Sequence, residues 1–354
     1  MERKQTDQIL PSSAQQLSLH GLDPPPRFIV NQTCFGNIES SPPLGQIPII
    51  DIALLSLLNS SQEASNELHK LRSALSSWGT FQAVNHGIPG SFLGEVRSVA
   101  REFFALPMDE KMKSSRQVND REGYGNDIIV SDEQTLDWTD RLVLGILPED
   151  SRKLHLWPAH PPRFSEVLLK YTTKIKFITD VVLKAMAISL NLDENSFLDQ
   201  YGASARILGR FNYYPRCSKP DAVLGLKAHT DGAGITVLLQ DEVIEGLQVM
   251  TDGQWFRAPI IPNSVIINLG DQMQIMSNGI FKSPLHRVTV SSKGDRLSVA
   301  MFKEPGRGTE IGPVSELVTE ARPRLYRNLK DYGAINFECF QKGIVPLDTV
   351  SVRL

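Results

Sequence analysis

The sequence predicts a mainly β fold with flanking helices, in which the carboxyl-terminal half forms an antiparallel barrel or jelly roll. After residue 203, short β-prone runs follow one another without a long helix between them. Asp252-Gly253 separates two of these runs and is a strong hairpin signal. Many short strands joined in this way are typical of antiparallel barrels and jelly rolls. The expected strands are 207–214, 234–240, 246–250, 254–258, 264–269, 281–290 and 296–302.

The amino-terminal part alternates short strands and helices. Residues 1–46 are rich in Ser, Gln and Pro and are expected to form a loosely held arm, with one weak helix over 12–20. In order, we expect a strand at 47–50, a helix at 61–77 that Gly79 ends, a strand at 81–84 and an amphipathic helix with Ser91 as its N-cap.

The middle of the chain is less regular. Residues 114–162 carry turns and aromatic residues without a long period, so they form either loops that line a cavity or a surface meander. Residues 163–192 have the apolar period of a long helix that supports the sheet. The expected regions are an arm (1–46), an α/β region (47–162), supporting helices (163–202), the jelly-roll core (203–305) and a helical carboxyl-terminal segment (306–354).

Composition excludes several classes of protein. The 354 residues carry a net charge of −3, which gives no footprint for nucleic acid. The three cysteines of the chain are far apart and form no Cys-x-x-Cys motif, so a reducing compartment is expected. No apolar run approaches the roughly 20 residues that cross a bilayer. We therefore expect a cytoplasmic monomer that binds a small molecule and no membrane.

A candidate metal site begins at His229 and Asp231, which are two residues apart. If this stretch is a strand, both side chains leave the same face and can bind one small cation. His286 lies 55 positions beyond Asp231, beside a second β-prone run, and is the natural candidate for a third ligand. Two imidazoles and one carboxylate on one side of a metal suit Fe(II) in oxygen-activating enzymes.

Arg296 and Ser298 form a second pair at a spacing of two, in an apolar run that predicts a buried strand. A buried arginine is costly unless it meets an anion, and a guanidinium beside a hydroxyl suits a carboxylate. A small dicarboxylate would therefore fit between Arg296 and the metal.

Together, these motifs resemble those of the plant Fe(II)- and 2-oxoglutarate-dependent dioxygenases, in the branch that acts on specialised metabolites such as flavonoids, alkaloids, coumarins and jasmonates. In the core, the resemblance rests on His-Thr-Asp at 229–231, His286, Arg-Leu-Ser at 296–298 and Phe-Asn-Tyr-Tyr-Pro at 211–215. Upstream, it includes Ile-Pro-Ile-Ile-Asp at 47–51, Trp-Gly-Thr-Phe-Gln-Ala-Val-Asn-His-Gly at 78–87 and Glu-Gly-Tyr-Gly at 122–125. The motifs occur in the family's order.

The resemblance implies a double-stranded β-helix core, which is cupin-like, with the metal at its open end. His229, Asp231 and His286 would bind Fe(II) and form the catalytic centre. The residues implied to bind 2-oxoglutarate are Arg296, Ser298, Tyr214 and Asn212. The implied reaction consumes O2, converts 2-oxoglutarate to succinate and carbon dioxide, and hydroxylates, O-demethylates, desaturates or cyclises a substrate. Ascorbate is the expected reductant.

The substrate cavity is predicted by analogy with the family's layout. Its expected wall residues are Tyr124, Val130, Trp138, Tyr213, Phe302 and Phe337. After Arg296 is assigned, the sequence shows no further cationic cluster, which favours a largely apolar substrate. Arg141 and Arg210 are single charges to which the sequence assigns no partner. His86 follows Asn85 at a turn and, without a partner at ligand spacing, is expected to be structural.

Three alternatives stay open at this point. A zinc hydrolase also uses two histidines and a carboxylate, but it would not require Arg296 and Ser298. An ascorbate-dependent oxidase of the same fold would share nearly all of these motifs and differ in its cosubstrate. A catalytically inactive relative that only binds a small molecule would predict drift in the ligand set, whereas all three ligand types are present.

Overall fold

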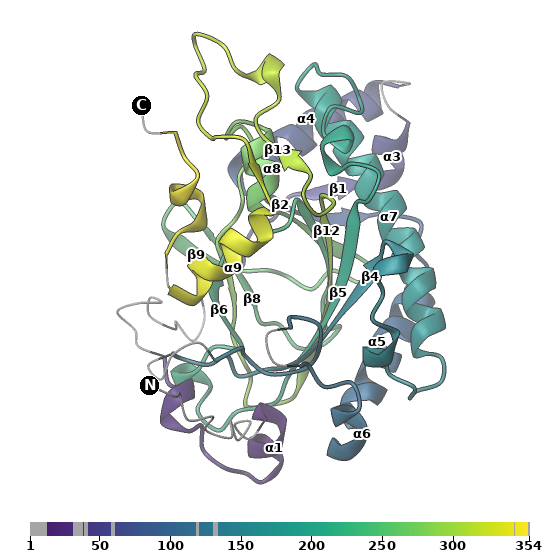
Figure 1. The fold of residues 1–354 in the computed structure, drawn as a ribbon, viewed down its shortest axis with the longest axis vertical. Helices are drawn as coiled ribbons and strands as arrows, with labels where there is room; N and C mark the ends of the chain where they lie inside the picture. The colour runs from purple at the N-terminus through teal and green to yellow at the C-terminus, as the bar shows by residue number, and fades with distance from the viewer. Residues whose placement is uncertain are drawn as a thin grey trace, which may run out of the picture.

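The computed structural model describes residues 13–30, 38, 42–57, 61–117, 120–129, 134–342 and 344–352. An eight-stranded sheet and a four-stranded sheet form the barrel at its centre (Figure 1). The large sheet has the order β1 (Ile49–Asp51), β2 (Thr80–Val84), β10 (Val265–Leu269), β7 (Ile235–Leu239), β12 (Arg296–Glu304), β5 (Arg206–Tyr214), β4 (Asp140–Leu147) and β3 (Gly123–Gly125). The small sheet has the order β6 (Leu226–His229), β11 (His286–Val288), β8 (Leu247–Thr251) and β9 (Gln254–Arg257).

Antiparallel pairing dominates both sheets, and β1 with β2 is the parallel exception among the named strands. The inner faces of the two sheets meet in one buried apolar cluster, to which β8 contributes Val249, β11 Val288 and β10 Ile266. This packing gives a jelly roll, so the predicted double-stranded β-helix core is confirmed.

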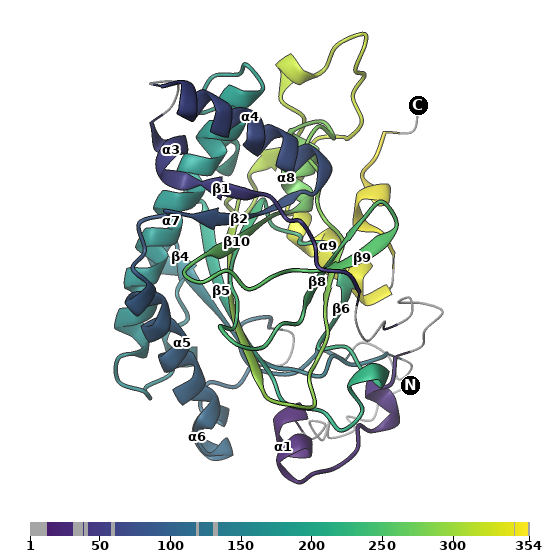
Figure 2. The same cartoon turned by 180° about the vertical axis from the view of Figure 1, so that it is seen from behind.

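Helices cover the outer face of the large sheet (Figure 2). The covering helices are α3 (Ile52–Ser56), α4 (Gln62–Ser77), α5 (Gly90–Ala105) and α7 (Phe164–Ser189). The long α7 contacts β7 and β12, as expected for a supporting helix. The remaining helices are α1 (Ala14–Leu19), α6 (Met108–Met112), α8 (Asp271–Met276) and α9 (Tyr332–Lys342). No helix in the described ranges is long and apolar enough to cross a membrane.

Short elements complete the chain. The 3-10 turns are Pro26–Phe28, Glu149–Ser151, Leu154–Leu156, Leu198–Tyr201, Pro220–Ala222, Ser315–Leu317 and Pro346–Thr349. A two-stranded sheet joins β13 (Glu310–Ile311) and β14 (Leu329–Lys330), so the segment expected to be helical also contains strands.

Two turn predictions are confirmed by backbone geometry. Gly79 has φ +68° and follows the last turn of α4, where a left-handed conformation ends the helix. Asp252 and Gly253 both have positive φ, and Thr251 pairs with Gln254 across them. This is the tight hairpin that the Asp-Gly signal predicts.

The structure also corrects three predictions. Pro89, and not Ser91, is the N-cap residue of α5. Residues 114–162 are not only loops, because they form strands β3 and β4. Both faces of β4 are largely buried, so its sequence lacks the polar–apolar alternation by which a half-buried strand is recognised. The strand expected over 281–290 shortens to three residues, 286–288.

Residues 13–30 of the amino-terminal arm, which include α1, pack at the lower end of the barrel in Figure 1, whereas Gly45 of the arm lies beside β9 and donates its N–H to the Arg257 carbonyl oxygen (2.8 Å). Leu17 and Phe28 belong to a buried cluster with Trp138. Gln15 donates a hydrogen bond from Nε2 to the Phe104 carbonyl oxygen (2.9 Å). None of the described arm residues lines the large cavity at the open end, so these contacts stabilise the fold.

Candidate active site

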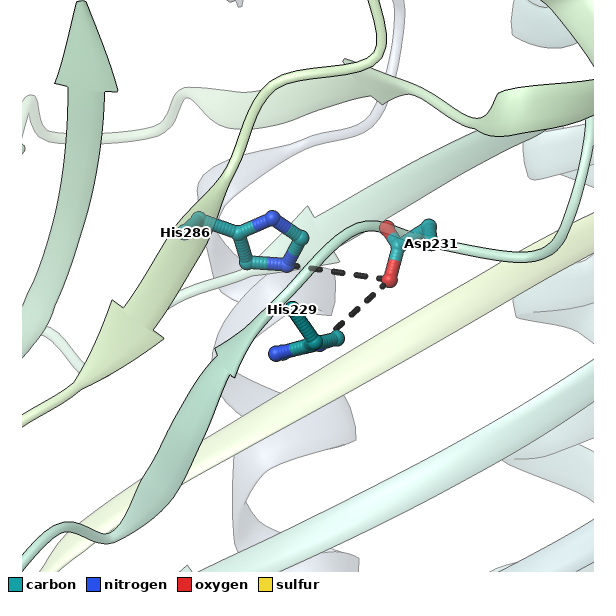
Figure 3. A group of neighbouring side chains, drawn as sticks. All are labelled: His229, Asp231 and His286. Carbon is teal, nitrogen blue, oxygen red and sulfur yellow. Dashed lines mark ion pairs between the residues drawn. The ribbon is translucent and has the colours of Figure 1, made fainter. Parts of the chain in front are cut away.

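Three side chains converge where the small sheet meets the loop after β6 (Figure 3). His229 ends β6, His286 begins β11, and the two residues are paired partners across these strands. The Nε2 atoms of both histidines lie 3.6 Å from Oδ1 of Asp231. One ligand atom from each residue lies within 4.8 Å of the others, and no other group of this kind occurs in the described ranges. The geometry suits one small metal ion.

Neighbouring groups orient each ligand. Nδ1–H of His229 donates to the Lys227 carbonyl oxygen (2.8 Å), and Nδ1–H of His286 donates to that of Pro284 (3.0 Å). Both Nε2 lone pairs therefore point toward the metal position, as is usual for metal-binding histidines. Thr236 donates to Oδ2 of Asp231 (2.7 Å), which leaves Oδ1 for the metal.

Electrostatics favour the neutral ligand form of His229. Burial, followed by the proximity of His286, lowers its pKa well below 6.5. A neutral imidazole is the form that binds a metal. Two histidines and one carboxylate leave open positions for a bidentate ligand, which is the donor set that suits Fe(II).

Next to this site, the inward faces of β5 and β12 hold the residues predicted to bind 2-oxoglutarate. Arg296 pairs with Tyr214 and Ser298 with Asn212 across the two strands. The guanidinium carbon of Arg296 lies 5.2 Å from the centre of the Tyr214 ring. Asn212 donates a hydrogen bond from Nδ2 to Ser298 Oγ (3.3 Å). All four predicted residues line one narrow cavity of about 40 Å³, which His229, Asp231 and His286 also line.

Arg296 provides the test of whether an anion fits this cavity. It is 1% exposed, and none of its three buried guanidinium nitrogens has a hydrogen-bond partner among the described residues. Burial lowers its pKa, which reflects the cost of a desolvated charge. A guanidinium left unpaired inside a protein is strongly unfavourable, whereas a carboxylate would satisfy it with bidentate hydrogen bonds. The residues present fit a dicarboxylate that reaches from Arg296 to the metal.

A second and larger cavity of about 730 Å³ opens beside the metal ligands. It shares Arg210, Leu226, His229, Asp231 and Phe302 with the narrow cavity. Its remaining walls come from the segment around residues 116–143, the inward face of β5, residues 302–311 and α9. A molecule in this cavity would lie next to the metal and the cosubstrate.

The predicted wall residues fall into three groups. Phe302 and Phe337 line the large cavity. Tyr124, Trp138 and Tyr213 do not, so those three predictions are wrong. Val130 lies outside the described residues.

The three misplaced aromatic residues have other partners. Tyr124 donates to Asp140 (3.0 Å). Trp138 packs edge-on against Phe28 and donates to the Pro215 carbonyl oxygen (3.0 Å). Tyr213 points to the opposite face of β5 from its neighbour Asn212, stacks on Phe104 and donates to Asp295 (2.6 Å). The alternation of side chains along a strand carries Tyr213 away from the cavity.

Sequence reasoning missed the charge of the large cavity. Six arginines line it together with six carboxylates, so the premise that no cationic cluster remains after Arg296 is wrong; the arginines are Arg116, Arg121, Arg141, Arg206, Arg210 and Arg307. Arg210 could have been found, because it is two residues before Asn212 on β5 and therefore faces the same way. Arg116 and Arg141 line the cavity only because the fold brings their segments next to β5, which no local sequence pattern indicates.

Arg141 belongs to a buried network of balanced charge. Its guanidinium forms ion pairs with Asp127 and Asp137. Lys227 pairs with the same two carboxylates, at 3.3 and 2.7 Å. Two cations therefore face two anions, and the network holds the strand that ends in His229. Burial opposes ionisation of Asp127, but Arg141 and Lys227 leave its pKa lowered.

His86 has the structural role that we expected. Its Nε2–H donates to the Asn263 carbonyl oxygen (2.8 Å), and its Nδ1 accepts from the backbone N–H of Ile88 (3.2 Å). Both ring nitrogens are therefore used within the protein, and burial lowers the pKa of this histidine.

Comparison with known proteins agrees with this geometry. The model of the 2OG-Fe(II) oxygenase superfamily matches residues 208–305, and that of the non-haem dioxygenase in morphine synthesis N-terminal region matches residues 47–160. Jasmonate-induced oxygenase 4 of Arabidopsis thaliana is 37% identical over 90% of both chains. Codeine O-demethylase of Papaver somniferum is 40% identical over 79% of this chain and 78% of its own.

A crystal structure of JOX2 in complex with 2OG, Fe and JA superposes with a TM-score of 0.86 at 31% identity, covering 96% of this chain and 98% of that one. A dioxygenase for auxin oxidation from rice gives 0.72 at 25% identity, covering 87% and 100%. The chain belongs to the 2OG-Fe(II) oxygenase family. It is an oxidoreductase that uses Fe(II), 2-oxoglutarate and O2.

Proposed function

We propose that this oxygenase oxidises a small organic acid, whose anionic group binds Arg210 and whose apolar part lies in the large cavity beside the metal. The observation that carries the proposal is Arg210 itself. Its Nη2 is buried without a hydrogen-bond partner among the described residues, and it forms no ion pair with a described carboxylate. Its Nε donates to the side-chain oxygen of Asn212 (2.7 Å), which aims the remaining nitrogens at the cavity.

The surrounding charges leave Arg210 uncompensated. Asp127 and Asp137 are already paired with Arg141 and Lys227. Burial disfavours the charged form of Arg210, and the nearby positive charge of Arg141 repels it. Together they lower the pKa of Arg210 to about 10. A desolvated, unpaired guanidinium costs several kcal/mol, and an anionic ligand would recover part of that cost. The same reasoning assigns Arg296 to the cosubstrate.

Arg116 adds a second cation to the cavity wall. Its guanidinium donates to the backbone carbonyl oxygens of Asn126 (2.9 Å) and Asp127 (3.3 Å), which satisfy its hydrogen bonds but not its charge. Burial, with Arg141 nearby, lowers its pKa to about 10. Arg116 and Arg210 both line the cavity and neither forms an ion pair with a described carboxylate, which favours an anion over a neutral or cationic substrate.

The rest of the cavity suits an apolar body. The hydrophobic lining residues are Ile128, Val143, Leu208, Leu226, Phe302, Ile311, Phe337 and Phe340. An acid with a hydrocarbon or aromatic part of modest size matches this combination. Relatives carry names that refer to jasmonate, auxin, codeine and flavonoids, so family membership alone does not choose between acids and other metabolites.

Each part of the site has a distinct task in this proposal. When bound, Fe(II) and 2-oxoglutarate supply the oxidising chemistry with O2. His229, Asp231 and His286 hold the metal, while Arg296 and Ser298 fix the far carboxylate of the cosubstrate. Arg210 anchors the substrate acid on the adjoining strand, so that a C–H bond of its apolar part lies near the metal. The reaction at that carbon would be hydroxylation, desaturation, O-demethylation or ring closure.

The rival functions differ in cosubstrate or reaction. Hydrolysis by zinc would leave Arg296 without an anion to bind, and family membership makes the chain an oxidoreductase. An oxidase that uses ascorbate in place of 2-oxoglutarate would share nearly all of these residues and differ in its cosubstrate. Ascorbate as a reductant, a monomeric state and a cytoplasmic location stay predictions from the sequence.

The experiment is a panel of small carboxylic acids, each paired with its methyl ester, and of neutral phenolic and alkaloid compounds. Succinate formation and product mass identify turnover. We expect an acid to be oxidised and its ester to react poorly. Arg210→Gln should raise the KM for the acid by about 10- to 150-fold, because a charge-assisted hydrogen bond is lost. Equal turnover of acid and ester, or an unchanged KM in folded Arg210→Gln, would overturn the proposal.

A matched variant controls for loss of an arginine elsewhere. Arg163 is 63% exposed in its side chain and pairs with Glu95 on the surface. Arg163→Gln should leave the KM for the acid and for 2-oxoglutarate unchanged.

A further inference from the structure

Asp271, the first residue of α8, joins two parts of the active site that are distant in sequence. It is fully buried. Its Oδ2 accepts hydrogen bonds from the side chains of Thr230 (3.1 Å), Tyr332 (2.7 Å) and Asn336 (3.0 Å). Thr230 lies between two metal ligands, whereas Tyr332 and Asn336 lie one helical turn apart on α9.

Backbone contacts strengthen the connection to the metal loop. The N–H of Asp271 donates to the carbonyl oxygen of Asp231 (2.8 Å). Gln272 donates from Nε2 to the carbonyl oxygen of Gly232 (2.7 Å). The start of α8 therefore supports the loop that follows His229 and carries the metal ligand Asp231.

The metal loop also touches α9 directly. A Cβ atom at Gly232 would lie 2.7 Å from the side chain of Asn336. A side chain larger than hydrogen would fit there only if the Asn336 side chain or α9 moved. Loop and helix are thus in contact twice, once through Asp271 and once at Gly232.

Helix α9 in turn forms one wall of the substrate cavity. Its lining residues are Tyr332, Gly333, Ala334, Asn336, Phe337 and Phe340. The ring of Phe340 lies 5.9 Å from that of His229, and the guanidinium of Arg121 lies 4.0 Å from the centre of the Phe337 ring. A displacement of α9 would move the substrate relative to the metal.

We propose that Asp271 is a positioning residue that couples occupation of the metal site to the placement of α9. It contacts neither the ligand atoms of the metal site nor the cavity; it acts through Thr230 on one side and through Tyr332 and Asn336 on the other. A metal that orders the 229–231 loop fixes Thr230, and the shared carboxylate oxygen then fixes α9 against the cavity. This inference does not depend on which substrate the enzyme takes.

A carboxylate suits this role because three donors converge on one oxygen. Hydrogen bonds to a charged acceptor are about twice as strong as those between neutral groups. Replacement by Ala would leave the buried hydroxyl of Tyr332 and the half-buried amide of Asn336 without their acceptor, whereas Asn keeps an oxygen acceptor without the charge.

The test is hydrogen–deuterium exchange of α9, measured in the apo-protein and with Mn(II) plus 2-oxoglutarate, which fill the site without turnover. In the wild type, occupation should slow exchange of the α9 amides. In Tyr332→Phe, α9 should exchange about 10-fold faster than in the wild type when the site is filled, since one hydrogen bond to a carboxylate is lost. Asp271→Ala should abolish the response to Mn(II), and Asp271→Asn should restore part of it.

Tyr326→Phe is the matched control. Its hydroxyl accepts a hydrogen bond from Gln274 on the same helix α8 (2.8 Å), but this contact does not reach the metal loop. It should leave the Mn(II)-dependent protection of α9 unchanged. Kinetically, Tyr332→Phe should raise the substrate KM and the ratio of succinate to oxidised product, and leave Mn(II) affinity within about threefold.

Two results would overturn the proposal. One is an α9 that responds to Mn(II) in Tyr332→Phe and Asp271→Asn as in the wild type. The other is an equal loss of protection in Tyr326→Phe and Tyr332→Phe, which would mean that the contacts only stabilise the fold. If Asp271→Ala does not fold, the comparison of Tyr332→Phe with Tyr326→Phe, together with Asp271→Asn, decides the question.

Discussion

Arg296 on β12 and Arg210 on β5 both direct a guanidinium into the barrel, but they lie in very different surroundings. Arg296 closes a narrow cavity of about 40 Å³ whose walls are adjacent strands. Arg210 stands at the border of a cavity of about 730 Å³ whose other walls come from loops and from α9. In our proposal, the narrow cavity binds 2-oxoglutarate, and the large cavity binds a substrate that contacts segments distant in sequence.

The difference in construction teaches which parts of the site tolerate change. The backbone hydrogen bonds between β12 and β5 hold Arg296 and Ser298 opposite Tyr214 and Asn212. Loop segments and a carboxyl-terminal helix can vary without disturbing those hydrogen bonds. Substitutions in the walls of the large cavity should therefore change substrate binding and leave the binding of 2-oxoglutarate intact.

The largest expected effect is at the metal. Asp231→Ala removes the one anionic ligand and leaves two imidazoles, so iron affinity should fall and substrate oxidation should drop by more than about 100-fold. The barrel should stay folded, because Asp231 lies in the loop after β6 and is not part of the apolar core. Iron content, product formation and circular dichroism are the measurements. Wild-type activity with iron still bound would show that Asp231 is not a ligand.

The same difference explains what the sequence could predict. Arg296 and Ser298 lie two residues apart on β12, and this spacing puts both side chains on one face of the strand. The predicted strand over 229–231 ends at His229, and Asp231 lies in the loop beyond it, although the ligand atoms of the two residues still converge. Arg116 and Arg141 reach the cavity only because the fold brings three segments together. The prediction that Tyr213 lines the cavity rests on family analogy, whereas alternation along the strand turns Tyr213, the neighbour of Asn212, to the opposite face.

The difference between packing and lining residues can be tested with two aromatic substitutions. Trp138 is fully buried, so Trp138→Ala should lower the free energy of unfolding by about 3–5 kcal/mol. Phe337 is half-buried at the cavity, so Phe337→Ala should cost about 1 kcal/mol and chiefly raise the KM for substrate. Chemical denaturation and steady-state kinetics are the measurements. If Trp138→Ala changes the substrate KM at a temperature where the variant is folded, Trp138 does line the cavity and the packing assignment is wrong.

The smallest expected effect concerns His86, the histidine that does not bind metal. His86→Gln should leave iron content unchanged and cost about 0.5–1.5 kcal/mol through one lost hydrogen bond. Burial lowers the pKa of His86 below 6.5, so the unfolded chain takes up a proton first as the pH falls. The wild type should therefore lose stability as the pH drops below about 6.5, and His86→Gln should lose less. Denaturant midpoints between pH 8 and 5 measure this, and equal slopes would refute it.

The division of roles between the two arginines is tested most directly by anaerobic titration of the Fe(II)-loaded protein with 2-oxoglutarate, followed by the visible charge-transfer absorption of the Fe(II)–2-oxo acid chelate. Arg296→Gln should require about 10- to 150-fold more 2-oxoglutarate, because the charge-assisted hydrogen bonds to the far carboxylate are lost. Arg210→Gln should titrate like the wild type. An unchanged affinity in folded Arg296→Gln, or an equal loss in Arg210→Gln, would contradict the assignment of Arg296 to the cosubstrate and of Arg210 to the substrate.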